Sequence, residues 1–179
     1  MTDPQETGIT RGCIAAGATA ALFLYIAVDF LIHGVTLAWY WKATAEYWRP
    51  QEELFRLILP SYGAFAILCG VLAWLMARLY GEKLNVATGA RFGLIAGLLY
   101  SGVGAVGSYC VFRMPASALF YWPLSGTVLA VVACTSAAWT MTAPRPWRRV
   151  VFSFLIALAL LILGVVAQNL FVPRDVYQH

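Results

Sequence analysis

A phenol, a carboxylate and an imidazole follow one another at helical spacing in the first quarter of this 179-residue chain. Tyr25, Asp29 and His33 are each four positions apart, so they lie on one face of an α-helix. Asp29 is the single acid in the apolar stretch between Arg11 and Lys42. A carboxylate in hydrocarbon costs roughly 2.5–3.5 kcal/mol unless it is paired or hydrated. An Asp–His pair offsets that cost by sharing a proton or by forming an ion pair.

Four interpretations of this stripe remain open. The pair is a structural polar clamp between helices, a proton or ion relay, a contact for a ligand or cofactor, or an interfacial feature. The choice depends on depth. Counted from Gly12, Asp29 lies near the outer boundary of the hydrocarbon core, whereas Trp39 and Trp41 as boundary markers place it deeper. The aromatic residues favour the deeper position.

Other chemistry has little support in the sequence. The second histidine, His179, is the last residue, and the four cysteines occur without C-x-x-C spacing. The chain contains no G-x-S-x-G, no H-E-x-x-H and no G-x-x-x-x-G-K-[ST] motif. We therefore predict no catalytic residue, no metal site and no cofactor, and a protein that is not an enzyme.

The composition places the polar stripe in a membrane. The chain is 61% hydrophobic and 11% charged, against about 45–50% and about 25% in typical soluble domains. These values exclude a soluble globular protein, a disordered chain and a nucleic-acid binder. We expect a single membrane domain over residues 1–179 with the lipid bilayer as its first partner.

Long runs with few or no charges predict an all-α fold, a polytopic membrane bundle of about five transmembrane helices. About 20 apolar residues cross the hydrocarbon core as a helix, and lipid cannot satisfy an open backbone. Pro60 falls in the first turn of the second span, where its missing N–H costs least. We expect the uniformly aliphatic last span at the edge of the bundle. The spans are predicted near 14–38, 57–77, 90–112, 119–141 and 150–171.

The loop over 39–56 combines aromatic rings with charged side chains. Trp39, Trp41 and Trp48 suit the headgroup zone of a bilayer, so we predict an interfacial anchor. Arg113, after the third span, is expected to extend to the headgroups. The alternative is a docking surface for another subunit, because Trp, Tyr and Arg dominate interface hot spots.

The third span carries a small residue at every fourth position, which predicts close helix packing. Gly102, Gly104 and Gly107 extend the thin surface. The packing partner is a helix of this chain, which we favour, or a helix of another chain. The stripe consists of Gly89, Gly93, Gly97, Ser101 and Ala105.

The basic residues predict an orientation. The N-terminal tail and the loops at 78–91 and 142–149 share one side and carry seven Lys and Arg, against five on the other side. The positive-inside rule then favours a cytoplasmic N-terminus and an external C-terminus in a bacterial inner membrane.

Four motifs resemble a known group of proteins. They are D-F-L-I-H-G at 29–34, W-Y-W-K at 39–42, the glycine-rich third span and Y-W-P-L at 121–124. Through them, residues 12–142 resemble small four-helix bacterial membrane proteins of uncharacterised function, although the fifth span departs from that pattern. The resemblance implies a membrane location and a helix bundle, and it carries no catalytic residue.

The sequence favours a non-enzymatic membrane protein, an accessory or structural subunit that packs against other membrane protein subunits. Few residues lie outside the predicted spans, and bare and aromatic surfaces suit contact. The first alternative is a small transporter or channel that uses Asp29 and His33. The second is a cofactor- or pigment-binding subunit with His33 as ligand.

Overall fold

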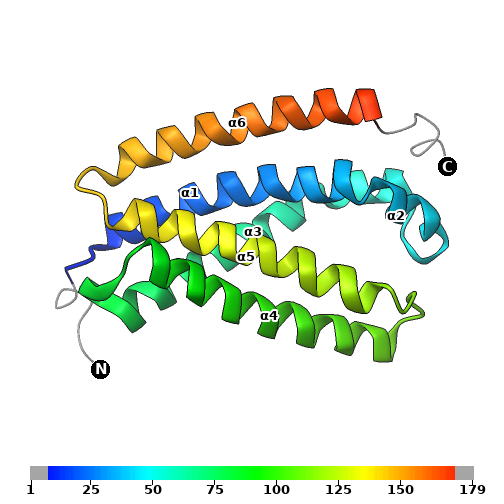
Figure 1. The fold of residues 1–179 in the computed structure, drawn as a ribbon, viewed down its shortest axis with the longest axis horizontal. Helices are drawn as coiled ribbons and strands as arrows, with labels where there is room; N and C mark the ends of the chain where they lie inside the picture. Colours follow the sequence, from blue (N-terminus) through cyan, green and yellow to red (C-terminus); the bar gives the residue numbers. More distant parts are fainter. Residues whose placement is uncertain (1–7, 172–179) are drawn as a thin grey trace.

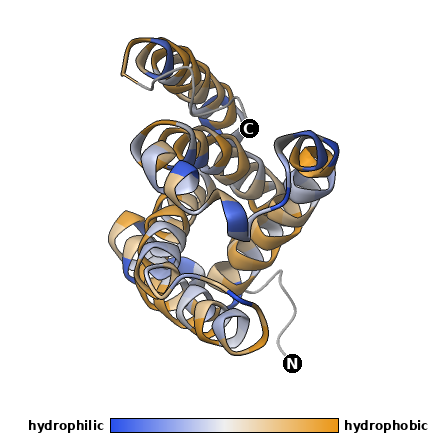
Figure 2. Cartoon of the chain, turned by 90° about the vertical axis from the view of Figure 1, so that its right-hand side faces the viewer, coloured by the Kyte–Doolittle hydropathy of each residue, from blue (hydrophilic) through white to orange (hydrophobic). Residues whose placement is uncertain are grey.

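The computed structural model describes residues 8–171 as an all-α bundle (Figure 1). Its long helices confirm the predicted fold class, a polytopic helical membrane bundle. Hydrophobic residues dominate the helices, as the colours of Figure 2 show. Five helices are long and apolar enough to cross a membrane: Arg11–Thr36, Arg56–Lys83, Val86–Val111, Ala118–Met141 and Pro146–Phe171.

The first span changes its helical geometry before it ends. Helix α1 (Arg11–Phe30) begins after Thr10, whose hydroxyl accepts from the Cys13 N–H at 3.3 Å. It continues into a π-helical segment, η2 (Leu31–Thr36). The predicted loop that follows contains a short helix, α2 (Ala38–Ala43), and a 3-10 turn, η3 (Ala45–Tyr47). No residue pattern in the sequence predicted the π-helical segment.

Helix α3 (Gln51–Tyr80) begins earlier than the predicted 57. Pro50 occupies the N-cap position without a capping side-chain hydrogen bond, and Glu52 and Glu53 in the first turn complement the helix dipole. The expectation that Pro60 falls in the first turn is therefore wrong, because Pro60 lies inside the helix. The helix ends at Gly81, whose φ of 49° suits glycine, and the 3-10 turn η4 (Gly81–Lys83) follows.

The last three helices lie close to their predicted bounds: α4 (Val86–Val111), α5 (Ala118–Met141) and α6 (Pro146–Phe171). Helix α4 begins before the predicted 90 because Asn85 and Thr88 form a capping box. Helix α6 begins before the predicted 150 with Pro146, a residue suited to the first helical position.

Helices α1 and α5 form the centre of the bundle (Figure 1). Helix α5 packs against α4 and α1, while α1 also contacts α3 and α6. Helix α6 lies at the edge, as expected, and rests mainly on α1. It buries one stripe of residues, namely Val150, Ser153, Ala157 and Gly164.

Candidate functional site

The structure brings Asp29 and His33 together near the end of the first span. Asp29 lies in the last turn of α1 and His33 in η2. Nε2 of His33 is 3.6 Å from Oδ1 of Asp29, and the two side chains are 28% and 26% exposed. This separation allows an ion pair with a protonated imidazole but exceeds that of a good hydrogen bond. Because both residues belong to one helical segment, the pair itself does not join two helices.

The π-helical geometry of η2 sets the position of His33. The Leu37 N–H bonds to the Ile32 carbonyl five residues back at 2.7 Å, and the Thr36 hydroxyl donates to the Leu31 carbonyl at 3.1 Å. π-Helical turns inside α-helices are rare and occur frequently at functional sites. The π-helical backbone therefore points to His33 as a candidate functional residue on structural grounds, in addition to the chemistry of its imidazole.

Tyr25, the third member of the predicted stripe, joins three helices. Its ring is buried and contacts the Phe65 ring of α3 at a centroid distance of 4.6 Å. Its hydroxyl lies within hydrogen-bonding reach of Tyr100 on α4. The Tyr100 hydroxyl donates to the Gly126 carbonyl of α5 at 3.2 Å. Tyr100 thus makes an interhelical polar contact in this region, as does the neighbouring Ser101, whose hydroxyl donates to the Pro123 carbonyl of α5 at 3.3 Å.

Sequence reasoning missed two residues of the site, Tyr62 and Tyr100. Together with Tyr25, they supply three phenols: the Tyr62 ring lies 6.4 Å from the Phe65 ring between centroids, and the Tyr100 hydroxyl donates to the Gly126 carbonyl. The three phenols come from α3, α4 and α1, so no spacing along the sequence relates them. Their position inside two predicted spans was the available signal, because a Tyr hydroxyl in an apolar environment requires a partner.

On its other side, His33 faces aromatic rings. The imidazole lies 5.3 Å from the Trp41 ring between centroids, and its Nδ1 is buried without a hydrogen-bond partner among the described residues. Trp41 contacts Trp48, and Trp48 stacks on Trp122 of α5 at 5.6 Å. We call this group the aromatic cap: Trp39, Tyr40, Trp41, Trp48, Tyr121 and Trp122.

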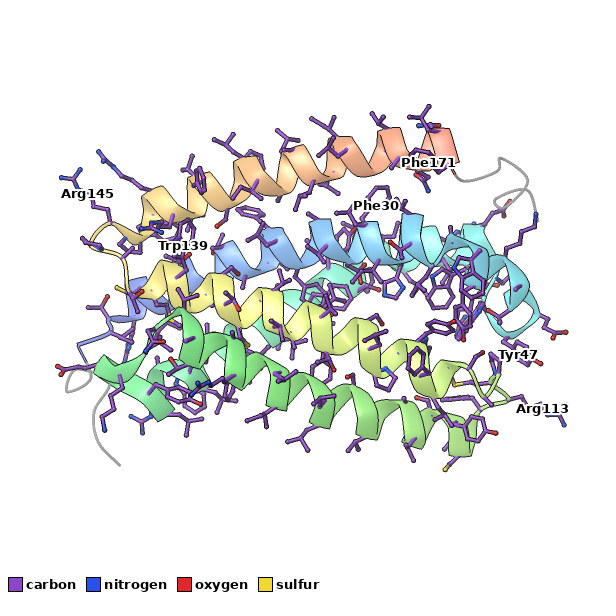
Figure 3. All side chains as sticks on the ribbon, viewed as in Figure 1. Phe30, Tyr47, Arg113, Trp139, Arg145 and Phe171 are labelled. Atoms are coloured by element: carbon purple, nitrogen blue, oxygen red, sulfur yellow. The ribbon has the colours of Figure 1, made fainter. Side chains whose placement is uncertain are left out.

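The predicted anchor residues all lie at the same end of the bundle, where rings crowd between the helices (Figure 3). Trp41 and Trp48 pack inward in the aromatic cap, and the Trp48 indole N–H donates to the Thr44 hydroxyl at 2.7 Å. Trp39 is 56% exposed, although its edge contacts Tyr121. Arg113 extends away from the bundle in Figure 3.

The stripe of small residues on α4 faces α5. A Cβ added at Gly93 would lie 2.6 Å from the Ala130 carbonyl oxygen, and one at Gly97 would lie 2.8 Å from Cα of Thr127. Gly89 and Ala105 are buried, and the Ser101 hydroxyl bonds to the Gly97 carbonyl. The internal packing favoured by the sequence analysis is therefore confirmed.

The described residues contain no group of three or more His, Cys, Asp or Glu side chains that could hold a metal ion. Cys13, Cys69, Cys110 and Cys134 are free thiols. His179, the second histidine weighed above, lies outside the described residues.

The chain matches no protein-family model, no curated protein and no solved structure. The resemblance to small four-helix bacterial membrane proteins therefore stays a prediction.

Proposed function

We propose that this chain is a non-enzymatic integral membrane protein, an accessory or structural subunit that packs against other membrane proteins. The observation that carries the proposal is a set of glycines that face outward from α3 and α4. A Cβ added at any of them would meet nothing within 4 Å: Gly63, Gly70, Gly102, Gly104 and Gly107.

These outward glycines have no role in the internal packing of the chain. Glycine inside a helix is about 1 kcal/mol less favourable than alanine. On α4, the internal packing explains why Gly89, Gly93 and Gly97 are glycines, because α5 leaves no room for a methyl group at these positions. A helix from another protein would give the outward glycines an equivalent reason, since bare surfaces let two backbones approach closely in lipid.

The proposal also covers location and orientation, with a cytoplasmic N-terminus in a bacterial inner membrane. It is supported by the gathering of basic residues at one end of the bundle, where α1, α4 and α6 begin and α3 ends. Anionic lipid on the cytoplasmic leaflet attracts such residues by about 1 kcal/mol each. They are Arg11, Arg78, Lys83, Arg91, Arg145, Arg148 and Arg149.

Photo-crosslinking in native membranes tests the proposal. A photoreactive amino acid replaces Val103, which is 71% exposed on α4 beside the outward glycines. We expect a covalent adduct with a second polypeptide, and we expect Gly104→Leu to abolish it by keeping the partner helix away. An adduct with lipid only, or a protein adduct unaffected by Gly104→Leu, would contradict the proposed surface.

A further inference from the structure

Arg149 is a half-buried cation near the start of α6 that lacks an anionic partner. Its guanidinium carbon lies over the Trp139 ring of α5, 3.9 Å from the ring centroid. The Phe152 ring of α6 contacts the same indole at a centroid distance of 5.9 Å. Within residues 8–171, no acid forms an ion pair with Arg149. Charge complementarity therefore calls for an anion at this position.

The contact with Trp139 prepares the guanidinium of Arg149 for a phosphate. Of the described residues, none accepts a hydrogen bond from its N–H groups, so all five donors are available. The planar group can give two parallel hydrogen bonds to phosphate oxygens. The indole also restricts the side chain before binding, which lowers the conformational entropy that is lost when a ligand binds.

Two further arginines lie within one turn of Arg149. The Arg148 N–H bonds to the Arg145 carbonyl at 3.1 Å, and both side chains are exposed. Arg145 extends away from the bundle in Figure 3. Among the described acids, only Glu82 lies at this end of the bundle, in the turn after α3. The positive charge of the three arginines is therefore not balanced within the described chain.

The arginines lie at the depth of phospholipid headgroups. Helix α6 has 26 residues, which makes it about 39 Å long, against about 30 Å for the hydrocarbon core. Its first turn therefore reaches the boundary of the bilayer. Trp147 and Phe152 are 55% and 53% exposed beside the arginines, so they offer apolar surface to acyl chains. A headgroup needs no path into the bundle, because the surrounding bilayer supplies it.

We infer that the α5–α6 turn carries a binding site for the phosphate of an acidic phospholipid. Arg149 donates to the phosphate oxygens, and Arg145 and Arg148 add positive charge that disfavours a zwitterionic lipid. Trp147 and Phe152 contact the acyl chains, which a free phosphate ion does not have. The inference requires a bilayer around the bundle, but it requires neither the subunit role nor one of the two orientations.

Native mass spectrometry of the full chain in a non-ionic detergent tests the site by titration with phosphatidylglycerol or phosphatidylcholine. We expect the wild type to bind phosphatidylglycerol more tightly. Arg149→Gln should weaken this binding about tenfold, because charge-assisted hydrogen bonds are lost. Arg91→Gln is the matched control, since it removes the same charge at the same end from an exposed position of α4, which packs on α5 and not on α6. It should leave the affinity nearly unchanged.

A second variant keeps the test decisive if Arg149→Gln does not fold. Arg145→Gln changes an exposed side chain before α6, so it should weaken phosphatidylglycerol binding without lowering the melting temperature. Equal affinities of the wild type for the two lipids would overturn the inference. Equal losses in the site variants and in Arg91→Gln would also overturn it, because they would show only a general attraction to positive charge.

Inorganic phosphate distinguishes a lipid from a free anion. We expect phosphatidylglycerol to stay bound when sodium phosphate replaces sodium sulfate at equal ionic strength. Displacement of the lipid by phosphate but not by sulfate would overturn the assignment to a phospholipid.

Discussion

Asp29 lies just before the π-helical segment η2, and this geometry brings its carboxylate beside His33 without a close hydrogen bond. The i, i+4 spacing of Tyr25, Asp29 and His33 was sufficient to predict that they share a face. It could not predict that the tyrosine, rather than the acid, reaches another helix, because that depends on where Tyr100 of α4 lies. The π-helical segment has no residue signature comparable to that of a proline or a cap.

Phe30 offers a direct test at the residue scale. Its ring fills the space that a side chain would occupy at Gly164 of α6, since a Cβ there would lie 2.8 Å from the ring. In Figure 3, Phe30 lies between α1 and α6. We expect Phe30→Ala to lower the free energy of unfolding by about 2–3 kcal/mol, because a half-buried ring leaves a void between the two helices. Denaturant titration followed by circular dichroism measures this loss.

Phe171→Ala is the matched control for this change. Phe171 is 78% exposed at the end of α6, so its removal should change stability by no more than about 0.5 kcal/mol. Equal losses for the two variants would show that Phe30 does not hold α6 in place.

At the scale of the helices, spacing predicted that α4 packs closely against another helix, but it predicted neither that this helix is α5 nor which glycines face outward. Gly89, Gly93 and Gly97 repeat every four residues, and that period identifies one face. Gly104 and Gly107 belong to the same glycine-rich run, yet they face away from α5 with no atom near them. Composition alone does not separate these two sets. The observed helix ends differ from the predicted ones where the capping residue lies several positions before the apolar run. Asn85, the N-cap of α4, is an example.

Two alanine substitutions on α4 separate the two kinds of glycine. Gly93→Ala places a methyl group 2.6 Å from the Ala130 carbonyl oxygen, so the helices must move apart. We expect a loss of about 1–3 kcal/mol in the free energy of unfolding. Gly104→Ala meets open space and should be neutral or stabilising by up to about 1 kcal/mol. Both are measured on the purified chain, and a reversed order would refute the described α4–α5 contact.

On the scale of the whole molecule, five spans place the beginning of α1 and the end of α6 at opposite ends of the bundle (Figure 1). Charge-free runs predicted this arrangement well, because the length of a span is set by the bilayer and not by tertiary detail. Apart from the edge position of the last span, the neighbours of each helix were not predictable, since α3, α4 and α6 are all apolar and any of them could have packed on α1.

Reporter fusions test the orientation. We expect alkaline phosphatase fused after His179 to be active, because the basic end of the bundle stays in the cytoplasm. A green fluorescent protein fused at the same position should be dark when exported through the general secretory pathway. An inactive phosphatase together with a bright fluorescent protein would reverse the orientation.

The mass of the assembly in native membranes bears most directly on the proposed subunit role. Native mass spectrometry of membrane vesicles, without prior detergent extraction, records the chain together with whatever protein it holds. The account predicts a complex heavier than the 19.6 kDa chain, reduced to the single chain by Gly104→Leu combined with Gly107→Leu. A wild-type protein found only as a 19.6 kDa species with bound lipid would contradict it.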